Sequence, residues 1–337
     1  INGVDEAALG NPNVTWEVAN QFNVGFDAYM FGNKFFLEFD YFNNLRSQIL
    51  VTRNASVPGS TGLVLPPENI AKVRNKGFEF QIGYQDTKGD FDYSIAFNAS
   101  YSKNKIVFWD ETPGIPDYQQ STGRPMGSSL YYEAIGIFKD QAEIDAYPHL
   151  PGAAPGDIIF KDVNGDQEIN GLDRVMNTKS SMPRLLGGVT LNFSYKKAID
   201  MSIFFQGAAG AVQYIDMVES GDWGNYYQFF AENHWTPDHT DATYPRAYNR
   251  SEPYWTNSAN TFWLKPTDYI RLKNIELGYS FSQNLTERIG IERLRIYANA
   301  FNLFTIDKLN HFDPEAIKTG RSYPAQRIIN MGIGLTF

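Results

Sequence analysis

The sequence contains no cysteine and only four histidines among its 337 residues. Without cysteine the chain can form no disulfide and no thiolate metal site, and it has no thiol nucleophile. Neither G-x-S-x-G nor H-E-x-x-H occurs, so the common motifs of serine hydrolases and zinc proteases are missing. We therefore expect a protein that is not an enzyme and that uses no organic cofactor.

Positive charge and long apolar runs are also scarce. Lys and Arg number 29 against 38 Asp and Glu, giving a net charge of -9, which argues against binding to nucleic acid. No uncharged apolar run reaches the roughly 18 residues of a membrane-spanning helix, and no signal-peptide pattern opens the sequence. Aromatic residues, in contrast, make up 15% of the chain, a surplus that needs a structural reason.

Apolar and polar residues alternate along much of the chain, which is the pattern of β-strands with two different faces. In the stretch FEFQIGY, Phe78, Phe80 and Ile82 alternate with Glu79 and Gln81. The same period recurs in residues 93–102, 187–195, 273–281 and 331–337. Short turns at 87–90 and 195–200 join neighbouring strands, so the pattern predicts antiparallel pairing and no sustained helix.

The length of these strands favours a membrane protein. They run to about ten residues or more, whereas ordinary globular strands average roughly five to six and a tilted membrane-spanning strand needs about nine to eleven. Long excursions at 51–74, 106–157 and 208–266 alternate with short turns, as in barrels with external loops and periplasmic turns. We predict an all-β fold, an antiparallel transmembrane β-barrel with long extracellular loops. A soluble sandwich with one buried face would show the same alternation.

The stretch KDVNGDQEINGLDR places oxygen ligands at the spacing of a twelve-residue calcium loop. The expected ligands are Asp162, Asn164, Asp166, the backbone carbonyl of Glu168, Asn170 and Asp173. Position 6 of such loops is normally Gly, for a sharp turn with positive φ, but Gln167 stands there. The alternative is an Asx-rich surface turn held by its own side-chain to backbone hydrogen bonds.

Eight stretches, taken in order, resemble the C-terminal part of the SusC/RagA family of TonB-dependent outer-membrane transporters from Bacteroidetes. They are NPNVTWE (11–17), VRNKGFEF (73–80), GRPMGSSLYYEAIGIF (123–138), PGDIIFKDVNGDQEINGLDR (155–174), HWTPDHTDATYPR (234–246), WLKPTDYIRLKNIELGYSF (263–281), RIYANAFNLFTI (295–306) and YPAQRIINMGIGLTF (323–337). Two departures are RPMGS, where the family usually has a Pro-Ile-Gly type of turn, and Gln167.

The resemblance implies a barrel of about 22 strands with an N-terminal plug, energised by TonB and lidded by a SusD-like surface lipoprotein. It implies a location in the outer membrane of a Gram-negative bacterium. We expect residues 1–337 to be the C-terminal part of the barrel without the plug, either a fragment or one of two polypeptides, with residues 155–174 within or beside an external loop. The terminal Phe337 resembles the signal for the outer-membrane assembly machinery.

The function implied by the resemblance is import of a large nutrient, an oligosaccharide or a peptide. Aromatic side chains in the loop DWGNYYQFFAENHW are the candidates for substrate contact, because flat rings stack on sugars and fill pockets for apolar groups. They are Trp223, Tyr226, Tyr227, Phe229 and Trp235. The alternative is that they pack a core within the loop or face the lipoprotein.

Two other functions fit parts of the sequence. A complete smaller porin would have a barrel of about 12 to 18 strands at this length. A soluble, calcium-dependent carbohydrate-binding β-protein would keep the calcium loop and the aromatic residues. The histidines His234 and His239 lack the helical spacing of a zinc site, so a polar loop is expected there.

Overall fold

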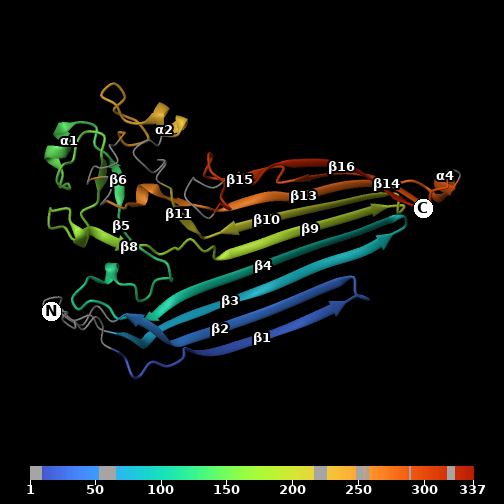
Figure 1. The fold of residues 1–337 in the computed structure, drawn as a ribbon, viewed down its shortest axis with the longest axis horizontal. Helices are drawn as coiled ribbons and strands as arrows, with labels where there is room; N and C mark the ends of the chain where they lie inside the picture. The colour runs from blue at the N-terminus through green and yellow to red at the C-terminus, as the bar shows by residue number, and fades with distance from the viewer. Residues whose placement is uncertain are drawn as a thin grey trace, which may run out of the picture.

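The computed structural model describes residues 10–52, 66–215, 226–247, 254, 258–287, 290–316 and 323–337. It consists of one long, curved sheet and a loop unit gathered at one end of that sheet (Figure 1). No helix in these ranges is both long and apolar enough to cross a membrane.

Nine strands pair in one antiparallel path, and β15 pairs with β13 beside it. The path runs through β1 (Val18–Met30), β2 (Phe35–Thr52), β3 (Pro67–Lys88), β4 (Phe91–Phe108), β9 (Leu185–Tyr195), β10 (Ile199–Ala209), β13 (Tyr269–Ser280), β14 (Arg293–Phe301) and β16 (Ile328–Thr336), with β15 at Thr305–Asp307. Among the described strands, β1 and β16 each have a partner on one side only. The sheet is therefore an open wall, and the predicted antiparallel strands are confirmed.

The two faces of the wall differ in chemistry. Large apolar side chains stand exposed on one face, among them Phe97 at 38%, Leu277 at 53% and Ile333 at 69%. The other face carries polar ladders, such as Ser202 Oγ donating to Asn192 Oδ1 at 2.9 Å and Asn192 Nδ2 donating to Ser94 Oγ at 3.1 Å. An exposed apolar face opposite a polar one is typical of a transmembrane barrel and not of a soluble sandwich.

The connections at the two ends of the wall are unequal. At one end, tight turns join β1 to β2, β3 to β4 and β9 to β10, and the short helix α4 (Gln283–Thr286) follows β13 (Figure 1). Lys196 and Lys197 form the β9–β10 turn with φ values of +53° and +55°, which matches the type I′ turn that tight hairpins favour. Residues 109–184 and the described residues of 210–268 lie at the other end (Figure 1).

These long connections fold into a loop unit with its own elements. Three two-stranded sheets pair β5 (Leu130–Tyr132) with β8 (Arg174–Met176), β6 (Ala134–Ile137) with β7 (Ile158–Phe160), and β11 (Val212–Tyr214) with β12 (Leu264–Pro266). Its described residues also form helices α1 (Gln141–Ala146) and α2 (Gln228–Asn233) and the 3-10 turns η2 (Asp117–Gln119), η3 (Gly171–Asp173) and η4 (Thr261–Trp263). The helices have at most six residues, too few to show a helical period in the sequence.

The loop unit is held together by a buried aromatic and aliphatic cluster. Its members are Tyr132, Ile158, Phe160, Ile169, Ile215, Phe230, Tyr254, Trp263 and Leu309. Phe230 and Trp263 are the deepest large rings, with 0% and 1% of their surface exposed. Part of the aromatic surplus of the sequence thus lies in this core, and part lies on the apolar face of the wall.

Candidate functional site

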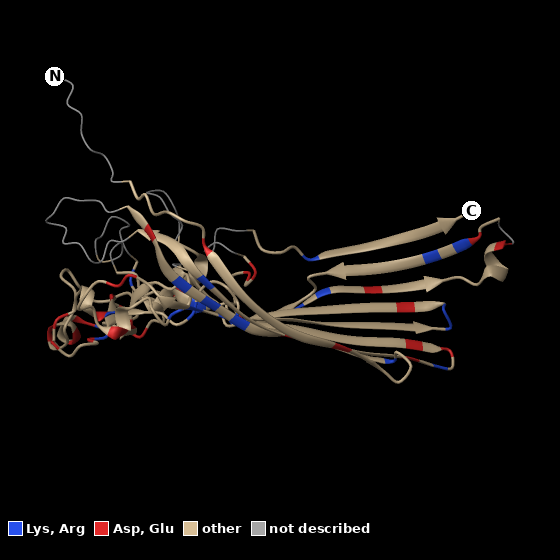
Figure 2. Cartoon of the chain, turned by 90° about the horizontal axis from the view of Figure 1, so that it is seen from below, with Lys and Arg blue, Asp and Glu red and all other residues tan. Residues whose placement is uncertain are grey.

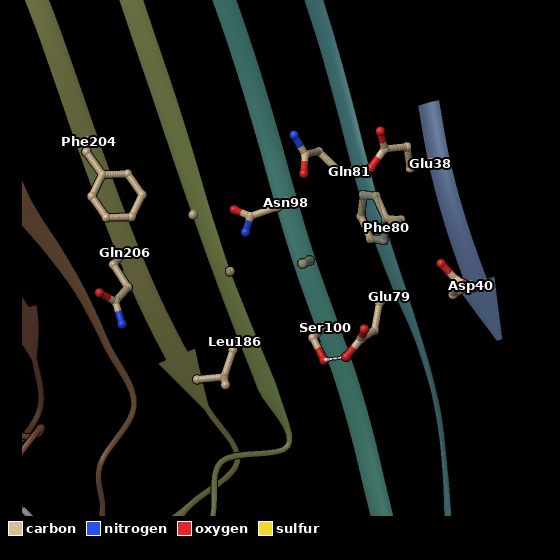
Figure 3. Close-up of a pocket in the computed structure, with 13 residues that line it drawn as sticks. Glu38, Asp40, Glu79, Phe80, Gln81, Asn98, Ser100, Leu186, Phe204 and Gln206 are labelled. Carbon is tan, nitrogen blue, oxygen red and sulfur yellow. Dashed lines mark hydrogen bonds between the residues drawn. The ribbon is translucent and has the colours of Figure 1, made fainter. Parts of the chain in front are cut away.

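A depression of about 430 Å³ lies on the polar face of the wall, across β2, β3, β4, β9 and β10 (Figure 3). Its polar lining comprises the carboxylates Glu38, Asp40 and Glu79, the amides Gln81, Asn98 and Gln206, and the hydroxyl of Ser100. Two aromatic residues, Phe80 and Phe204, also line it. These groups offer many hydrogen-bond acceptors and donors, so this surface suits polar, hydroxylated or cationic material.

The carboxylates of this surface face one another in register. Asp40 lies opposite Glu79, and Asp27 lies opposite Glu38. Like charges directly opposite each other destabilise a sheet unless something offsets them. Local hydroxyls give part of the compensation, since Ser100 Oγ donates to Glu79 Oε1 at 2.9 Å and the Tyr29 hydroxyl donates to Glu38 Oε1 at 3.1 Å.

Further along the same face, one arginine bridges three strands. The Arg295 guanidinium on β14 donates to Glu276 Oε1 on β13 at 2.8 Å and forms an ion pair with Asp200 on β10. Asp200 lies opposite Gly278 on β13, and a Cβ at that glycine would overlap the guanidinium. Because Gly278 has no side chain, the side chain of Arg295 can lie over it and reach β10, two strands away.

A second charged cluster ties a loop segment to the loop end of β13. Arg271, 3% exposed, donates from Nε to Thr305 Oγ1 and from Nη2 to Asp313 Oδ1, both at 2.7 Å, and pairs with Glu315. Lys273 Nζ lies 2.7 Å from Glu315 Oε1. Burial opposes ionisation of Asp313, but Arg271 and the backbone N–H groups of Ala325 and Glu315 hold the pKa of its carboxyl below the ordinary value.

The aromatic side chains predicted to contact substrate mostly pack against other rings of the loop unit. Tyr226 stacks on Phe230 with ring centroids 4.6 Å apart, and Tyr227 stacks on Phe229 at 5.6 Å. Phe229 also stacks on the His311 ring at 3.9 Å. All three predicted rings are half-buried, so part of each remains open to a ligand.

Trp235, another of the predicted aromatic residues, has different partners. Trp235 donates from Nε1 to the carbonyl of Lys139 at 3.3 Å, and its ring occupies the space that a Cβ at Gly156 would need. Beside it, Arg246 Nε donates to the fully buried Asp157 at 2.6 Å. Trp223 falls outside the described residues.

The histidines of this region have ordinary polar partners. Nδ1 of His234 lies 2.7 Å from the carbonyl oxygen of Ala231, and Nε2 of His239 lies 3.7 Å from Asp241 Oδ1. Within the described ranges, no three His, Asp or Glu side chains surround a point that could hold a metal ion.

The loop predicted to bind calcium closes on its own hydrogen bonds. Asp162 accepts from the backbone N–H of Gly165 at 2.7 Å and of Gln167 at 2.9 Å. The buried Asp173 accepts from Val163 at 2.9 Å and from Asn170 at 2.8 Å. This is the arrangement that the Asx-rich turn predicts, with the carboxylates directed at backbone N–H groups.

The other expected ligands also bond within the loop. Asn164 Oδ1 accepts from Asp166 N at 3.0 Å, Asp166 Oδ1 from Glu168 N at 2.9 Å, and Asn170 Oδ1 from Leu172 N at 2.8 Å. The sharp turn at position 6 is nevertheless made, because Gln167 adopts a φ of +64°. The side-chain oxygens retain free lone pairs, but their present directions brace the turn.

The family model described as TonB dependent receptor-like, beta-barrel matches residues 2–303. The chain belongs to this family. Among its relatives, TonB-dependent receptor P3 of Formosa agariphila is 29% identical over 367 residues, an alignment covering 100% of this chain and 36% of that protein. SusC of Bacteroides thetaiotaomicron is 23% identical, covering 97% and 32% respectively.

The solved structure of the RagAB peptide transporter has the same fold, with a TM-score of 0.72 at 22% identity, covering 100% of this chain and 38% of that one. The SusC/RagA resemblance and the partial barrel fold are thus confirmed. The chain spans about a third of the length of the SusC/RagA relatives it matches.

Sequence reasoning did not identify the two arginine clusters of this SusC/RagA wall. The available signal was charge at polar positions of alternating strands, such as Glu276 and Arg295. Which charges meet depends on strand register between segments far apart in the chain, and alternation alone does not give that register.

Proposed function

We propose that this chain is the wall and external loop unit of an outer-membrane importer energised by TonB. The observation that carries the proposal is the two-faced wall, with an apolar face for lipid and a hydrogen-bonding depression on the opposite face. In a closed barrel that depression lines the lumen. Strands outside this chain would pair with the free edges of β1 and β16, since an open edge does not persist in a membrane.

The cargo class that we propose is an oligosaccharide or a peptide. The lumen face offers carboxylate, amide and hydroxyl groups, which suit either kind of molecule, and the loop unit offers half-buried rings. The solved relative, RagAB, is a peptide transporter, and SusC is a TonB-dependent receptor. We propose a SusD-like surface lipoprotein as the partner above the loop unit, TonB as the partner acting through the plug, and the assembly machinery as the partner of Phe337.

Tyr226, Tyr227, Phe229 and Trp235 remain our candidates for contact with cargo at the mouth of the barrel, with Trp223 beside them in the sequence. Tyr227→Ala in the full-length transporter would lower cargo affinity by about 1–2 kcal/mol if its ring stacks on the ligand. Thermal stability of the purified protein separates this effect from damage to the loop unit. Tyr323→Ala is a matched control, because Tyr323 is 98% exposed.

We also propose weak calcium binding by Asp162, Asn164, Asp166, the Glu168 carbonyl, Asn170 and Asp173, as a brace for an external loop. The spacing of the ligands and the positive φ of Gln167 support it. The ion would supply no chemistry beyond fixing the turn. Chelation would speed proteolysis at residues 161–174 while the wall stays folded. Equal cleavage rates with and without chelator would mean that the turn is stabilised by its own hydrogen bonds and not by calcium.

Cargo uptake by intact cells tests the main proposal. A strain without this transporter is complemented with the full-length gene, and accumulation of labelled oligosaccharide or peptide pools is measured with and without TonB. Energised uptake of one pool supports the importer. Passive uptake that does not depend on TonB would support the porin instead.

A further inference from the structure

Four basic side chains form a compact patch at the loop end of the wall. They are Arg74 and Lys76 on β3, and Lys103 and Lys105 on β4, and all four are exposed. The register places Arg74 opposite Lys105 and Lys76 opposite Lys103. Opposed side chains start about 5 Å apart and successive pairs lie about 7 Å along the strand, so four cations occupy one small rectangle.

The four patch residues form no ion pair with a carboxylate in the described part of the chain. Several other basic residues of the wall have carboxylate partners, such as Lys34 with Asp86 at 2.6 Å and Arg46 with Glu17 at 3.3 Å. None of the described ion pairs involves the four patch residues. The chain carries a net charge of -9, so this cluster does not follow from a surplus of cations. Like charges held in register call for an external anion.

The patch lies on the apolar face of the wall. Side chains alternate along a strand, so Arg74 and Lys76 share a face with Phe78 and not with Glu79. The next opposed pair after Lys76 and Lys103 is Phe78 and Tyr101, whose rings stack at 5.6 Å. The depression lined by Glu79 belongs to the opposite face.

The position of the patch along β3 matches a membrane boundary. Below Lys76, the same face carries only uncharged residues until Asp86, ten positions later. At about 3.3 Å per residue and a tilt of about 40°, these positions span about 25 Å, the height of the apolar band of a barrel. Figure 2 shows basic segments gathered on neighbouring strands at the end of the wall next to the loop unit.

We infer that this patch binds the phosphate groups of an anionic lipid of the outer leaflet. Long loops mark the external end of a barrel, so the four cations lie at the level of the outer head groups. Lys and Arg are strong ligands of phosphate, and the rectangle can engage two phosphates of one head group. Phe78 and Tyr101 directly below provide an apolar surface for the acyl chains. The inference rests on the membrane placement proposed above but not on any cargo.

The test uses the full-length transporter in detergent and measures lipid binding by native mass spectrometry. The probes are diphosphorylated lipid A and its dephosphorylated form. The variant is Lys76→Gln/Lys103→Gln, and Lys196→Gln/Lys197→Gln at the opposite end of the wall is the matched control. Each charge facing an anionic lipid contributes roughly fivefold in affinity, so we expect about 25-fold weaker binding of the phosphorylated lipid to the variant alone.

Several results would overturn the inference. One is equal affinity of both variants for phosphorylated lipid A; another is full displacement by millimolar inorganic phosphate, which marks a general anion site. If the variant no longer co-purified with a protein that binds the wild type, and lipid binding did not change, the patch would be a binding site for that protein. Heat-modifiable migration on gels confirms that each variant has folded, and Lys103→Gln alone serves where the double variant has not.

The two proposals fail in different ways. If the wild-type protein transports no nutrient but still prefers phosphorylated lipid, the importer proposal is wrong and the lipid-site inference stands. If the wild-type protein binds neither form of the lipid, both proposals are wrong, because the placement of the wall in the membrane is then wrong.

Discussion

At the scale of single residues, glycine determines which long side chains can cross the inner face of the wall. Arg295 passes over Gly278 to reach Asp200. The arginine and its two carboxylate partners are partly exposed, between 21% and 43%, so solvent weakens each pair. The arrangement fixes three strands through one side chain, and it depends on a position without a Cβ.

Substituting Gly278 by Ala would push the guanidinium aside and break at least one of its carboxylate contacts. We expect a loss of about 1–2 kcal/mol in the free energy of unfolding, in the range of one hydrogen bond to a charged group. Urea titration of the full-length protein in detergent measures it. Gly334→Ala is the control, since the nearest atom to a Cβ there is 3.9 Å away. Equal stability of the two variants would contradict the role given to Gly278.

Gln167 adopts the left-handed conformation that glycine takes without strain. We therefore expect Gln167→Gly to protect residues 161–174 more strongly in hydrogen exchange, by a free energy of about 1 kcal/mol. Glu168→Gly is the matched control, because Glu168 has no positive φ. Glycine at this position relieves no strain and only raises the chain entropy of the unfolded state, which lowers stability. If the Glu168 variant were more protected from hydrogen exchange than the Gln167 variant, Gln167 would not be strained in the wild-type protein.

Asp313 links pH to the attachment of residues 309–316. Its pKa is lowered in the folded state, so the stability it contributes is present above the unfolded value of about 3.9 and is lost as pH falls through the folded value. We expect hydrogen exchange of this segment to accelerate below about pH 4. The same cluster also contains Tyr269, Arg271, Lys273 and Glu315. Asp313→Asn would be loose already at neutral pH, and a tightly held segment in that variant would contradict the link.

At the scale of elements, the wall and the loop unit have different sources of stability. The wall relies on strand pairing and a polar inner face, whereas the loop unit relies on its buried rings. Phe230 on α2 is fully buried in that unit. The loop unit therefore has the properties of a separate folding unit attached to the wall.

Phe230→Ala should cost the loop unit about 3–5 kcal/mol, because it leaves a large cavity in the core. We expect the aromatic near-UV signal of the loop unit to melt earlier, while the strand signal of the wall keeps its midpoint. Tyr323→Ala, at an exposed position, should change neither. A single transition that shifts as a whole would mean that loop unit and wall fold together.

The alternation of apolar and polar residues predicted the strands in which every second residue is apolar, as in residues 78–84. It missed the first half of β3, which begins at Pro67, because Lys, Arg and Asn occupy both faces there. The sequence places residues 67–74 in a long excursion, whereas the structure places them in β3, where Arg74 belongs to the basic patch. The short helices α1 and α2 were missed because fewer than two turns give no period.

The site was less predictable than the fold. The aromatic residues of the external loop could be named from the sequence, but their mutual stacking depends on tertiary contacts with Phe312 and His311, far along the chain. The calcium spacing was visible, whereas the directions of its carboxylates were not. The register that brings Asp200, Glu276 and Arg295 together joins three separate strands, and no local pattern encodes it.

At the scale of the whole molecule, an apolar outer face, a polar inner face and an external loop unit make up one side of a barrel that other strands must close. The central claim is that this barrel imports cargo actively. The most direct measurement is accumulation of labelled cargo by cells expressing the full-length transporter, before and after the proton gradient is dissipated. The account predicts accumulation above the external concentration that collapses with the gradient. Uptake that only equilibrates, at the same rate in both conditions, would contradict it.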